Sequence, residues 1–583
     1  MTGHRATVRI STGHLVVASV LLGVSLVAAM GWIAFRVWDT ATSLQRAAEA
    51  GKTAASALAA GDLDGARAGL VELSSAGAAA GSAAQDPTWA VAAAMPVLGD
   101  DIAAVGVLAR AVDTLARTLA IPAAAMFTDS TDATGTAELA RWAPTLDSAV
   151  AGLADVRTEL AGVDTTGLVG PIANAVDELT GILDQAAPAI ETARAGAAVA
   201  GVLNGGETSV LVLMQNSAEL RTGGGITGSF ALLRIADGEV SLEAQADSST
   251  FPALLEPIVP VTAAQDALYG DVVGRFVQNA SMPTDFAETA QLASAWWQSA
   301  GHAAPDLVVS VDVPAIGALL NVVGAVRLPD GSELTDANIV QRVLVDPYLS
   351  LDSDQQTQLM QSAVAATVDG IAGAQIDPLR WLSALATPIS EGRLSVWSAD
   401  ADVETLLQQS ALGGPAARVA AAGDDAFGVF FNDGTGGKMD VYLHVDMVVT
   451  SAACRPDGLA DVVVQLTMSS SAPADAEFAL PGDVTGRGLF GTGVGDIGTS
   501  VSVSAPPGSY FGGVTKDGAR ALSVDVDDAG RPTSLVRVNL SPAEVNVVEF
   551  HFTMGTPGQV TPTIVHTPLL NAAAVTVAEG GCG

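Results

Sequence analysis

The pattern of apolar and polar positions divides the chain into parts with different periods. The first part is an uncharged run of 21 residues from Leu15 to Phe35. As a helix this run spans roughly 30 Å, which matches the hydrocarbon core of a bilayer. Arg5 and Arg9 precede it, so the positive-inside rule predicts a cytoplasmic N-terminus and an extracytoplasmic body. We expect a single-pass signal anchor in the plasma membrane; the alternative is a signal peptide cleaved near Val27-Ala28-Ala29.

Residues 37–200 have the period of helices rather than that of strands. They are rich in alanine, and prolines separate stretches in which apolar residues recur at helical spacing. The clearest stretch comprises Val105, Leu108, Val112, Leu115 and Leu119. This pattern predicts a helical stalk or bundle. Its apolar seam is typical of an internal core, and a homo-oligomer formed through the stalk is the alternative.

From Ser209 the pattern changes to strands that alternate with helices. The expected strands are Ser209–Gln215, Phe230–Ile235, Val240–Glu243 and Asp306–Val311. The expected helices lie at 285–300, 314–322, 352–372, 378–386 and 401–411. Such alternation is typical of an α/β core.

From about Phe427 the pattern is that of short strands separated by Gly, Pro, Asp and Asn turns. Regularly spaced short strands of this kind predict a β-sandwich. The expected fold class is therefore α+β with several domains. Their ranges are 1–36 for the cytoplasmic tip and transmembrane helix, 37–200 for the stalk, 201–435 for the α/β core and 436–583 for the β-sandwich.

The composition and net charge of the chain exclude some classes of function. The chain carries 26 basic and 63 acidic residues, a net charge of −37, and every acidic residue follows the anchor. So acidic a body is unsuited to nucleic acid, whose phosphates bind clustered Lys and Arg. The scarcity of lysine, with abundant Ala, Gly and Val, indicates a GC-rich genome such as an actinobacterial one.

Two cysteines, Cys454 and Cys582, lie in the last quarter of the chain. In an exported domain such a pair most simply forms one disulfide bond. No His accompanies either cysteine in sequence, so we expect no metal site there.

The candidate for chemistry is the glycine-rich loop Gln215–Ser229, which follows the first core strand. Gly223, Gly224 and Gly225 would let backbone N–H groups approach an anion, and Arg221 would add a charge suited to phosphate. The loop lacks the Lys-Ser/Thr ending of a nucleotide-binding P-loop and is followed by a strand. The alternative is a structural turn in which Glu219 and Arg221 form an ion pair on its rim.

Hydrolase motifs are missing from the sequence. It contains neither Gly-x-Ser-x-Gly nor His-Glu-x-x-His, and its few histidines after the anchor are far apart. No catalytic residue can be assigned, and the sequence leaves open whether the chain is an enzyme.

The loop also carries a resemblance. Its segment Asn216-Ser-Ala-Glu219-Leu-Arg221-Thr-Gly-Gly-Gly225 resembles family 4012 of the domains of unknown function, which is common in actinobacterial membrane proteins. The matching pattern continues through Asn279, Asp285-Phe286, Val309–Asp312, Leu328–Gly331 and Lys438–Leu443. The resemblance adds Asn279 and Asp285 to the candidate anion site, whose other members are Asn216, Glu219, Arg221 and the three glycines. The family name implies no activity.

A weaker resemblance concerns the order of strands and helices over 209–328, which is similar to the LytR-CpsA-Psr family. Those membrane enzymes transfer glycopolymers from polyprenyl pyrophosphate to the cell wall, with arginines on the pyrophosphate and Asp with Mg²⁺. The later arginine-rich helix of that family is missing here. We therefore expect a cell-envelope protein without cofactors that supports surface-polysaccharide assembly by binding a cell-wall glycopolymer or a lipid-linked precursor. The alternative is a Mg²⁺-dependent phosphotransferase of LytR-CpsA-Psr type.

Overall fold

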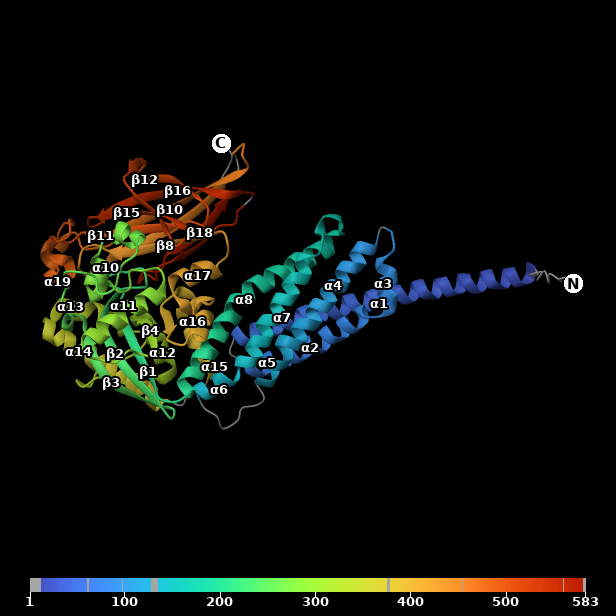
Figure 1. Ribbon diagram of the computed structural model, residues 1–583, viewed down its shortest axis with the longest axis horizontal. Helices are drawn as coiled ribbons and strands as arrows, with labels where there is room; N and C mark the ends of the chain where they lie inside the picture. The colour runs from blue at the N-terminus through green and yellow to red at the C-terminus, as the bar shows by residue number, and fades with distance from the viewer. Residues whose placement is uncertain are drawn as a thin grey trace, which may run out of the picture. The chain divides into compact units, whose positions relative to one another are not determined.

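The computed structural model describes residues 12–59, 62–96, 98–126, 135–374, 378–452, 455–558 and 560–579. It divides into two compact units (Figure 1). The N-terminal unit comprises residues 1–132 and 142–190, and the C-terminal unit comprises residues 133–141 and 191–583. The division falls inside one helix, α8, close to the end predicted for the stalk at residue 200.

The N-terminal unit is helical, as its period predicts. Its helices are α1 (Thr12–Ala59), α2 (Leu63–Ala84), α3 (Pro87–Ala93), α4 (Gly99–Leu115), α5 (Ile121–Met126), α7 (Ala143–Ala161) and the first part of α8 (Gly170–Asn204). Small residues let these helices pack closely: a Cβ at Gly106 would lie 2.6 Å from Nε1 of Trp89. That indole N–H donates a hydrogen bond to the carbonyl oxygen of Ile102 at 3.1 Å.

The predicted anchor and disulfide are not placed by this structure. Leu15 to Phe35 lies within α1, but most of its side chains are outside the described residues, as are Arg5, Arg9, Cys454 and Cys582. Within the described part of the chain, no helix meets the combined length and apolarity that a membrane span requires.

The C-terminal unit begins with an α/β core built on a five-stranded sheet. In sheet order its strands are β3 (Glu239–Asp247), β2 (Ile226–Ala236), β1 (Thr208–Asn216), β4 (Leu307–Asp312) and β7 (Leu394–Ser398). The central strand β1 pairs with β4 in parallel and with β2 in antiparallel orientation. The sheet is therefore mixed, and β7, on one edge, is a strand that the sequence pattern did not predict.

Helices cover both faces of this sheet. The helices of the core are α6 (Thr136–Arg141), α9 (Ala263–Tyr269), α10 (Val272–Arg275), α11 (Phe286–Ser299), α12 (Val313–Val323), α13 (Asp346–Ser350), α14 (Ser353–Gly373), α15 (Pro378–Glu391), α16 (Ala401–Gln408) and α17 (Pro415–Ala421). A two-stranded ribbon, β5 (Val326–Arg327) with β6 (Glu333–Leu334), follows α12. Because side chains alternate along β1, Leu211 and Leu213 pack against Trp297 of α11 on one face.

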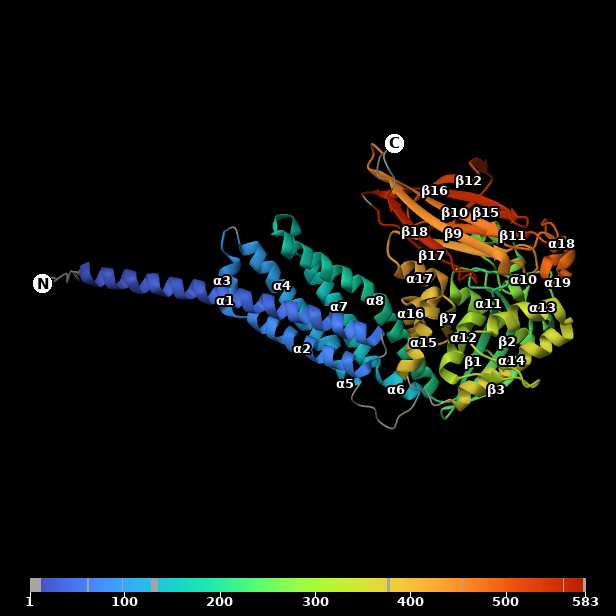
Figure 2. The ribbon, with the colours of Figure 1, turned by 180° about the vertical axis from the view of Figure 1, so that it is seen from behind.

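The rest of the C-terminal unit consists of two sheets, hereafter the C-terminal sheets. One has the order β13 (Ala519–Ala521), β12 (Tyr510–Lys516), β16 (Val545–Pro557), β10 (Leu459–Ser470), β9 (Leu443–Ala452), β18 (Ala574–Glu579). The other has the order β14 (Val524–Asp528), β15 (Arg531–Leu540), β11 (Ile497–Ser504), β8 (Ala426–Asp433), β17 (Thr563–His566). Two short helices, α18 (Ala476–Ala479) and α19 (Gly482–Thr485), lie between β10 and β11 (Figure 2).

Both C-terminal sheets contribute to one apolar core. Phe427 and Phe431 of β8 belong to the same buried cluster as Val464 of β10 and Phe550 of β16. The predicted start of this region at residue 436 is corrected, because β8 already belongs to it from Ala426 onward. Leu220 from the glycine-rich loop of the α/β core is also a member of this cluster.

Candidate functional site

The glycine-rich loop between β1 and β2 is buried between the α/β core and the C-terminal sheets. Leu220 is 1% exposed, and its N–H donates to Oδ2 of Asp440 at 2.7 Å. Its carbonyl oxygen accepts from the N–H of Asp433 at 2.8 Å. The loop therefore joins two parts of the unit that are about two hundred residues apart in sequence.

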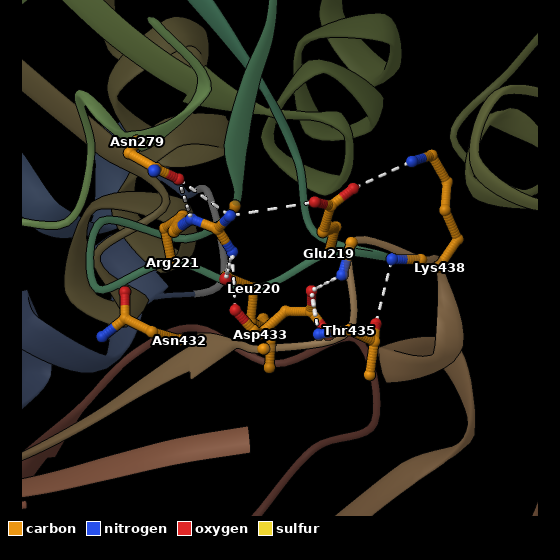
Figure 3. A network of polar contacts seen from close by, with 12 residues as sticks. Glu219, Leu220, Arg221, Asn279, Asn432, Asp433, Thr435 and Lys438 are labelled. Carbon is orange, nitrogen blue, oxygen red and sulfur yellow. Dashed lines mark hydrogen bonds and ion pairs between the residues drawn. The ribbon is translucent and has the colours of Figure 1, made fainter. Parts of the chain in front are cut away.

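The Arg221 guanidinium is engaged by protein acceptors (Figure 3). Its Nε and Nη2 donate to Oδ1 of Asn279 at 3.1 and 3.0 Å. Its Nη1 donates to the carbonyl oxygens of Leu220 at 2.7 Å and Asp433 at 3.2 Å. Nη2 also lies 3.8 Å from Oε1 of Glu219. With a side chain only 8% exposed, Arg221 has its donors directed at the protein.

The N–H groups of the three glycines are also engaged within the protein. Gly223 donates to the carbonyl oxygen of Ser281, Gly224 to that of Arg221, and Gly225 to Oε1 of Gln215. Gly224 has a φ of 125°, and a Cβ at Gly225 would lie 2.3 Å from the carbonyl oxygen of Asn216. These positions require glycine for backbone conformation and close packing. The geometry favours the structural turn that was the alternative prediction, but the Glu219–Arg221 pair expected on its rim is buried.

All the predicted site residues except Asp285 lie close together in the structure. Asn216, Glu219, Arg221, the glycines and Asn279 form one neighbourhood, in which Asn279 Nδ2 donates to the carbonyl oxygen of Val272. Asp285 is used elsewhere: its carboxylate accepts from the N–H of Ala287 and caps the N-terminus of α11.

Two buried carboxyl groups that were not predicted as site residues, those of Asp433 and Asp440, lie next to Arg221. Burial, followed by repulsion from Glu219, raises the pKa of Asp433 to about 6. Burial and the charge of Asp433 raise the pKa of Asp440 well above its ordinary value. Two sequence features point to these carboxyl groups. Asn432-Asp-Gly, a turn signal, stands at the end of a fully buried strand, and Asp440 lies in the segment Lys438–Leu443.

Lys438 connects this network to the interior of the α/β core. Its Nζ donates to Oε2 of Glu219 at 2.9 Å and lies 4.9 Å from the centroid of the Tyr348 ring. Burial alone would lower the pKa of Lys438, but Glu219 outweighs it and the pKa is raised. Tyr348 Oη accepts from Nδ2 of Asn216 at 2.9 Å. Lys438, Tyr348 and Asn216 all line a cavity.

This cavity, of about 540 Å³, separates the sheet of the α/β core from the helices on one of its faces. Val210, Val212 and Met214 line it from β1, on the face opposite Leu211 and Leu213. Its helical wall is made by side chains of α12, α14 and α15, among them Met360, Ala363, Val364, Val368, Ile371 and Trp381.

The cavity has a polar end and an apolar end. The register pairs Met214 with Ser229 and Ser229 with Asp247, so these side chains lie at one level of the sheet, near Asn216 and Tyr348. At the other end Val210 pairs with Leu233. Most ligand pockets share this character, with an apolar lining and a few placed polar groups.

Two residues of the lining have a buried side-chain N–H group without a partner among the described residues, Nε1 of Trp381 on α15 and Nε2 of Gln215. The Gln215 amide lies against the glycine-rich loop, where its Oε1 accepts from the N–H of Gly225. An unsatisfied buried donor is costly, so Nε1 of Trp381 is a candidate to donate a hydrogen bond to a bound molecule.

Four arginines of the described α/β core have partners other than the Arg221 network. Arg234 pairs with Glu207, Arg275 with Asp271, and Arg327 with Glu333. Arg342 donates to Ser332 Oγ. Where side chains are described, no three His, Cys, Asp or Glu residues form a group able to hold a metal ion.

Comparison with known families agrees with the pattern in the loop. Residues 205–348 match the family described as protein of unknown function, DUF4012. This DUF4012 segment contains β1, the glycine-rich loop and Tyr348, so the predicted resemblance is confirmed over these residues.

No curated protein matches the chain. Among solved structures, a Legionella pneumophila protein named for a suspected role in nutrient binding is similar over 24% of this chain at 7% identity. The match covers 47% of that protein's length, with a TM-score of 0.15.

Proposed function

We propose that this protein binds a lipid of the cell envelope, whose apolar chain occupies the cavity beneath the sheet of the α/β core. The observation that carries the proposal is the cavity itself, about 540 Å³ in volume and lined mainly by aliphatic side chains. Burying a methylene group in such surroundings contributes about 0.8 kcal/mol, so a chain of ten would contribute about 8 kcal/mol. Left empty, the same space would lose dispersion contacts.

The polar end of the cavity suits an uncharged head group that carries hydroxyls. Among the described residues that line the cavity, Lys438 is the only basic one, and Glu219 neutralises it. Asp247 adds an acidic group at the same end. A glycolipid, with an apolar chain and a hydroxyl-rich head that lacks pyrophosphate, matches both ends of the cavity.

We further propose that the chain is held at the plasma membrane by Leu15 to Phe35, with its body outside the cell. Exposed aromatic side chains lie at the end of this run and just after it on α1: Trp32 is 48% and Trp38 is 63% exposed, with Phe35 between them. Tryptophan is enriched where helices leave a bilayer. In this proposal the N-terminal helices are a stalk, with self-association through it the second possibility, and the C-terminal sheets are a β-sandwich that supports the lipid-binding core. A disulfide between Cys454 and Cys582 would close that sandwich.

The alternative is a LytR-CpsA-Psr-like phosphotransferase that uses the same core and Mg²⁺. A polyprenyl chain would fit the apolar cavity. A pyrophosphate, however, needs several converging positive groups, and Arg221 is already engaged by Asn279. The arginines of the core lie in other ion pairs. Binding without transfer therefore explains more of the structure.

Photocrosslinking of the full-length protein in vesicles tests the proposal. A phospholipid with a diazirine at the end of one acyl chain should label peptides of β1, β2 and α14. Val364→Trp fills the cavity and should reduce this labelling at least five-fold, whereas Gln361→Trp, on the exposed side of the same helix, should leave it unchanged. Labelling of α1 from the bilayer serves as the internal standard. Equal labelling of both variants would overturn the proposal.

A further inference from the structure

The segment between β10 and β11 exposes large apolar side chains. Phe478 is 85% and Phe490 is 71% exposed, and Leu489 is also exposed. The surface of a soluble protein rarely exposes several large apolar side chains within one short segment, unless they contact a partner or a membrane.

The local backbone holds these side chains outward. Phe490 has a φ of 59°, in the left-handed region that a bulky residue seldom adopts. Gly488 and Gly491 on either side have φ of 71° and 76°. Phe478 lies on α18, only four residues long, where few neighbours cover it. A side chain that is exposed at the cost of backbone strain indicates a functional role.

This segment lies beside the polar end of the cavity. Helix α19 contacts α13, which carries Tyr348, and the two helices lie side by side in both ribbon views (Figures 1 and 2). Val484 of α19 lines a small recess together with Tyr348 and Lys438. Leu349, next to Tyr348, is 43% exposed.

The stretch from Phe478 to Val494 carries no net charge in a strongly acidic chain, whereas the acidic residues Asp475, Glu477 and Asp496 flank it within the same segment. Between Phe478 and Val494 the charged residues are Asp483 and Arg487, which form an ion pair at 2.6 Å. The chain as a whole carries −37. A bilayer with anionic lipids repels an acidic surface, but it accepts a neutral one that presents aromatic and aliphatic side chains.

We propose that Leu349, Phe478, Leu489 and Phe490 form a bilayer-contacting surface through which lipid reaches the polar end of the cavity. The inference rests on the proposed lipid binding, since it explains why an apolar surface adjoins that end. Insertion of these side chains at the level of the head groups lets a lipid leave the bilayer without crossing water. Its head group then remains near Lys438 and Tyr348.

The test measures contact with the bilayer in the full-length protein, reconstituted in vesicles of phosphatidylethanolamine and phosphatidylglycerol with nitroxide-labelled acyl chains. An environment-sensitive fluorescent amino acid replaces Phe490 or, as the matched control, Leu255, which is 90% exposed on a loop of the α/β core. Quenching at position 490 should be at least twice that at position 255. Equal quenching would overturn the proposal and assign the surface to a protein partner or a second copy of the chain.

Two variants separate this surface from the cavity. Val364→Trp should abolish photocrosslinking of lipid in the cavity while quenching at position 490 persists. Phe478→Ser combined with Phe490→Ser should slow lipid loading at least five-fold while the final occupancy of the cavity stays unchanged. Unchanged loading in the double variant would contradict a role in uptake, even if lipid binding itself is confirmed.

Discussion

At the scale of single residues, Arg221 was predicted from the sequence to bind an anion, whereas in the structure it forms hydrogen bonds to other segments of the protein. Its guanidinium binds Asn279 and the carbonyl oxygen of Asp433, and through them it joins the glycine-rich loop to two other segments. The arginine is thus part of the contact between the α/β core and the C-terminal sheets.

We predict that Arg221→Met destabilises the C-terminal unit by about 3 kcal/mol, because it leaves buried acceptors such as Oδ1 of Asn279 without their donor. Arg234→Met is the control, since its pair with Glu207 is exposed and contributes at most about 1 kcal/mol. Denaturant unfolding of the full-length protein measures both. An Arg221 variant with wild-type stability but reduced lipid binding would show that the loop contacts the ligand.

Asp433 makes the same network sensitive to pH. Its pKa in the folded protein is about 6, above the ordinary value of 3.8, because it is buried and faces Glu219. The folded state therefore holds a proton that the unfolded state has lost between these values, and stability falls as the pH rises from about 4 to about 6. The raised pKa of Asp440 acts in the same direction.

We predict that Asp433→Asn makes the free energy of unfolding less dependent on pH over this interval, by a total of about 3 kcal/mol at most. Asp483→Asn, at an exposed ion pair, is the control and should leave the slope unchanged. Urea unfolding between pH 4 and 7 provides the measurement. A wild-type slope in the Asp433 variant would contradict the assignment.

At the scale of elements, the loop between β1 and β2 depends on glycine at one position more than at its neighbours. A Cβ at Gly225 would meet the carbonyl oxygen of Asn216 at 2.3 Å, whereas a Cβ at Gly228 would meet nothing within 4 Å. The side chain introduced by Gly225→Ala therefore fits only if the backbone of the loop or of Asn216 moves.

We predict that Gly225→Ala costs about 1–3 kcal/mol of stability, and that Gly228→Ala changes it by less than about 0.5 kcal/mol. Chemical denaturation of the two variants compares them directly. Equal stability would mean that the loop does not pack against β1 as described.

Sequence patterns predicted the elements best where one periodic face is buried. β1, β2, α11 and α14 were expected within a few residues of their observed bounds, because their apolar positions repeat with a single period. In the α/β core the strand β7 was missed. It lies on the edge of its sheet, and a short edge strand gives a weak pattern.

The candidate site was predicted in composition but not in role. A run of three glycines beside an arginine suggests free donors, yet Gly223 donates to Ser281 and Arg221 to Asp433. Acceptors that distant cannot be deduced from local spacing. The cavity was missed because Val210, Val212 and Met214 alternate like the residues of any buried strand. Only the folded chain shows that α14 is held away from the sheet.

At the scale of the whole molecule, the proposed lipid binding is compatible with a net charge of −37. An apolar cavity needs little positive charge, and Lys438 with its partner Glu219 adds no net charge at its polar end. In our proposal the exposed apolar side chains of Phe478 and Phe490 are the part of this acidic chain that contacts a bilayer.

Native mass spectrometry of the full-length protein, released from its membrane, tests the proposed lipid binding most directly. We predict that about one lipid remains bound per chain in the wild type and in Gln361→Trp, and that Val364→Trp loses it. A chain that retains no lipid, or a Val364→Trp variant that retains as much as the wild type, would contradict lipid binding in the cavity.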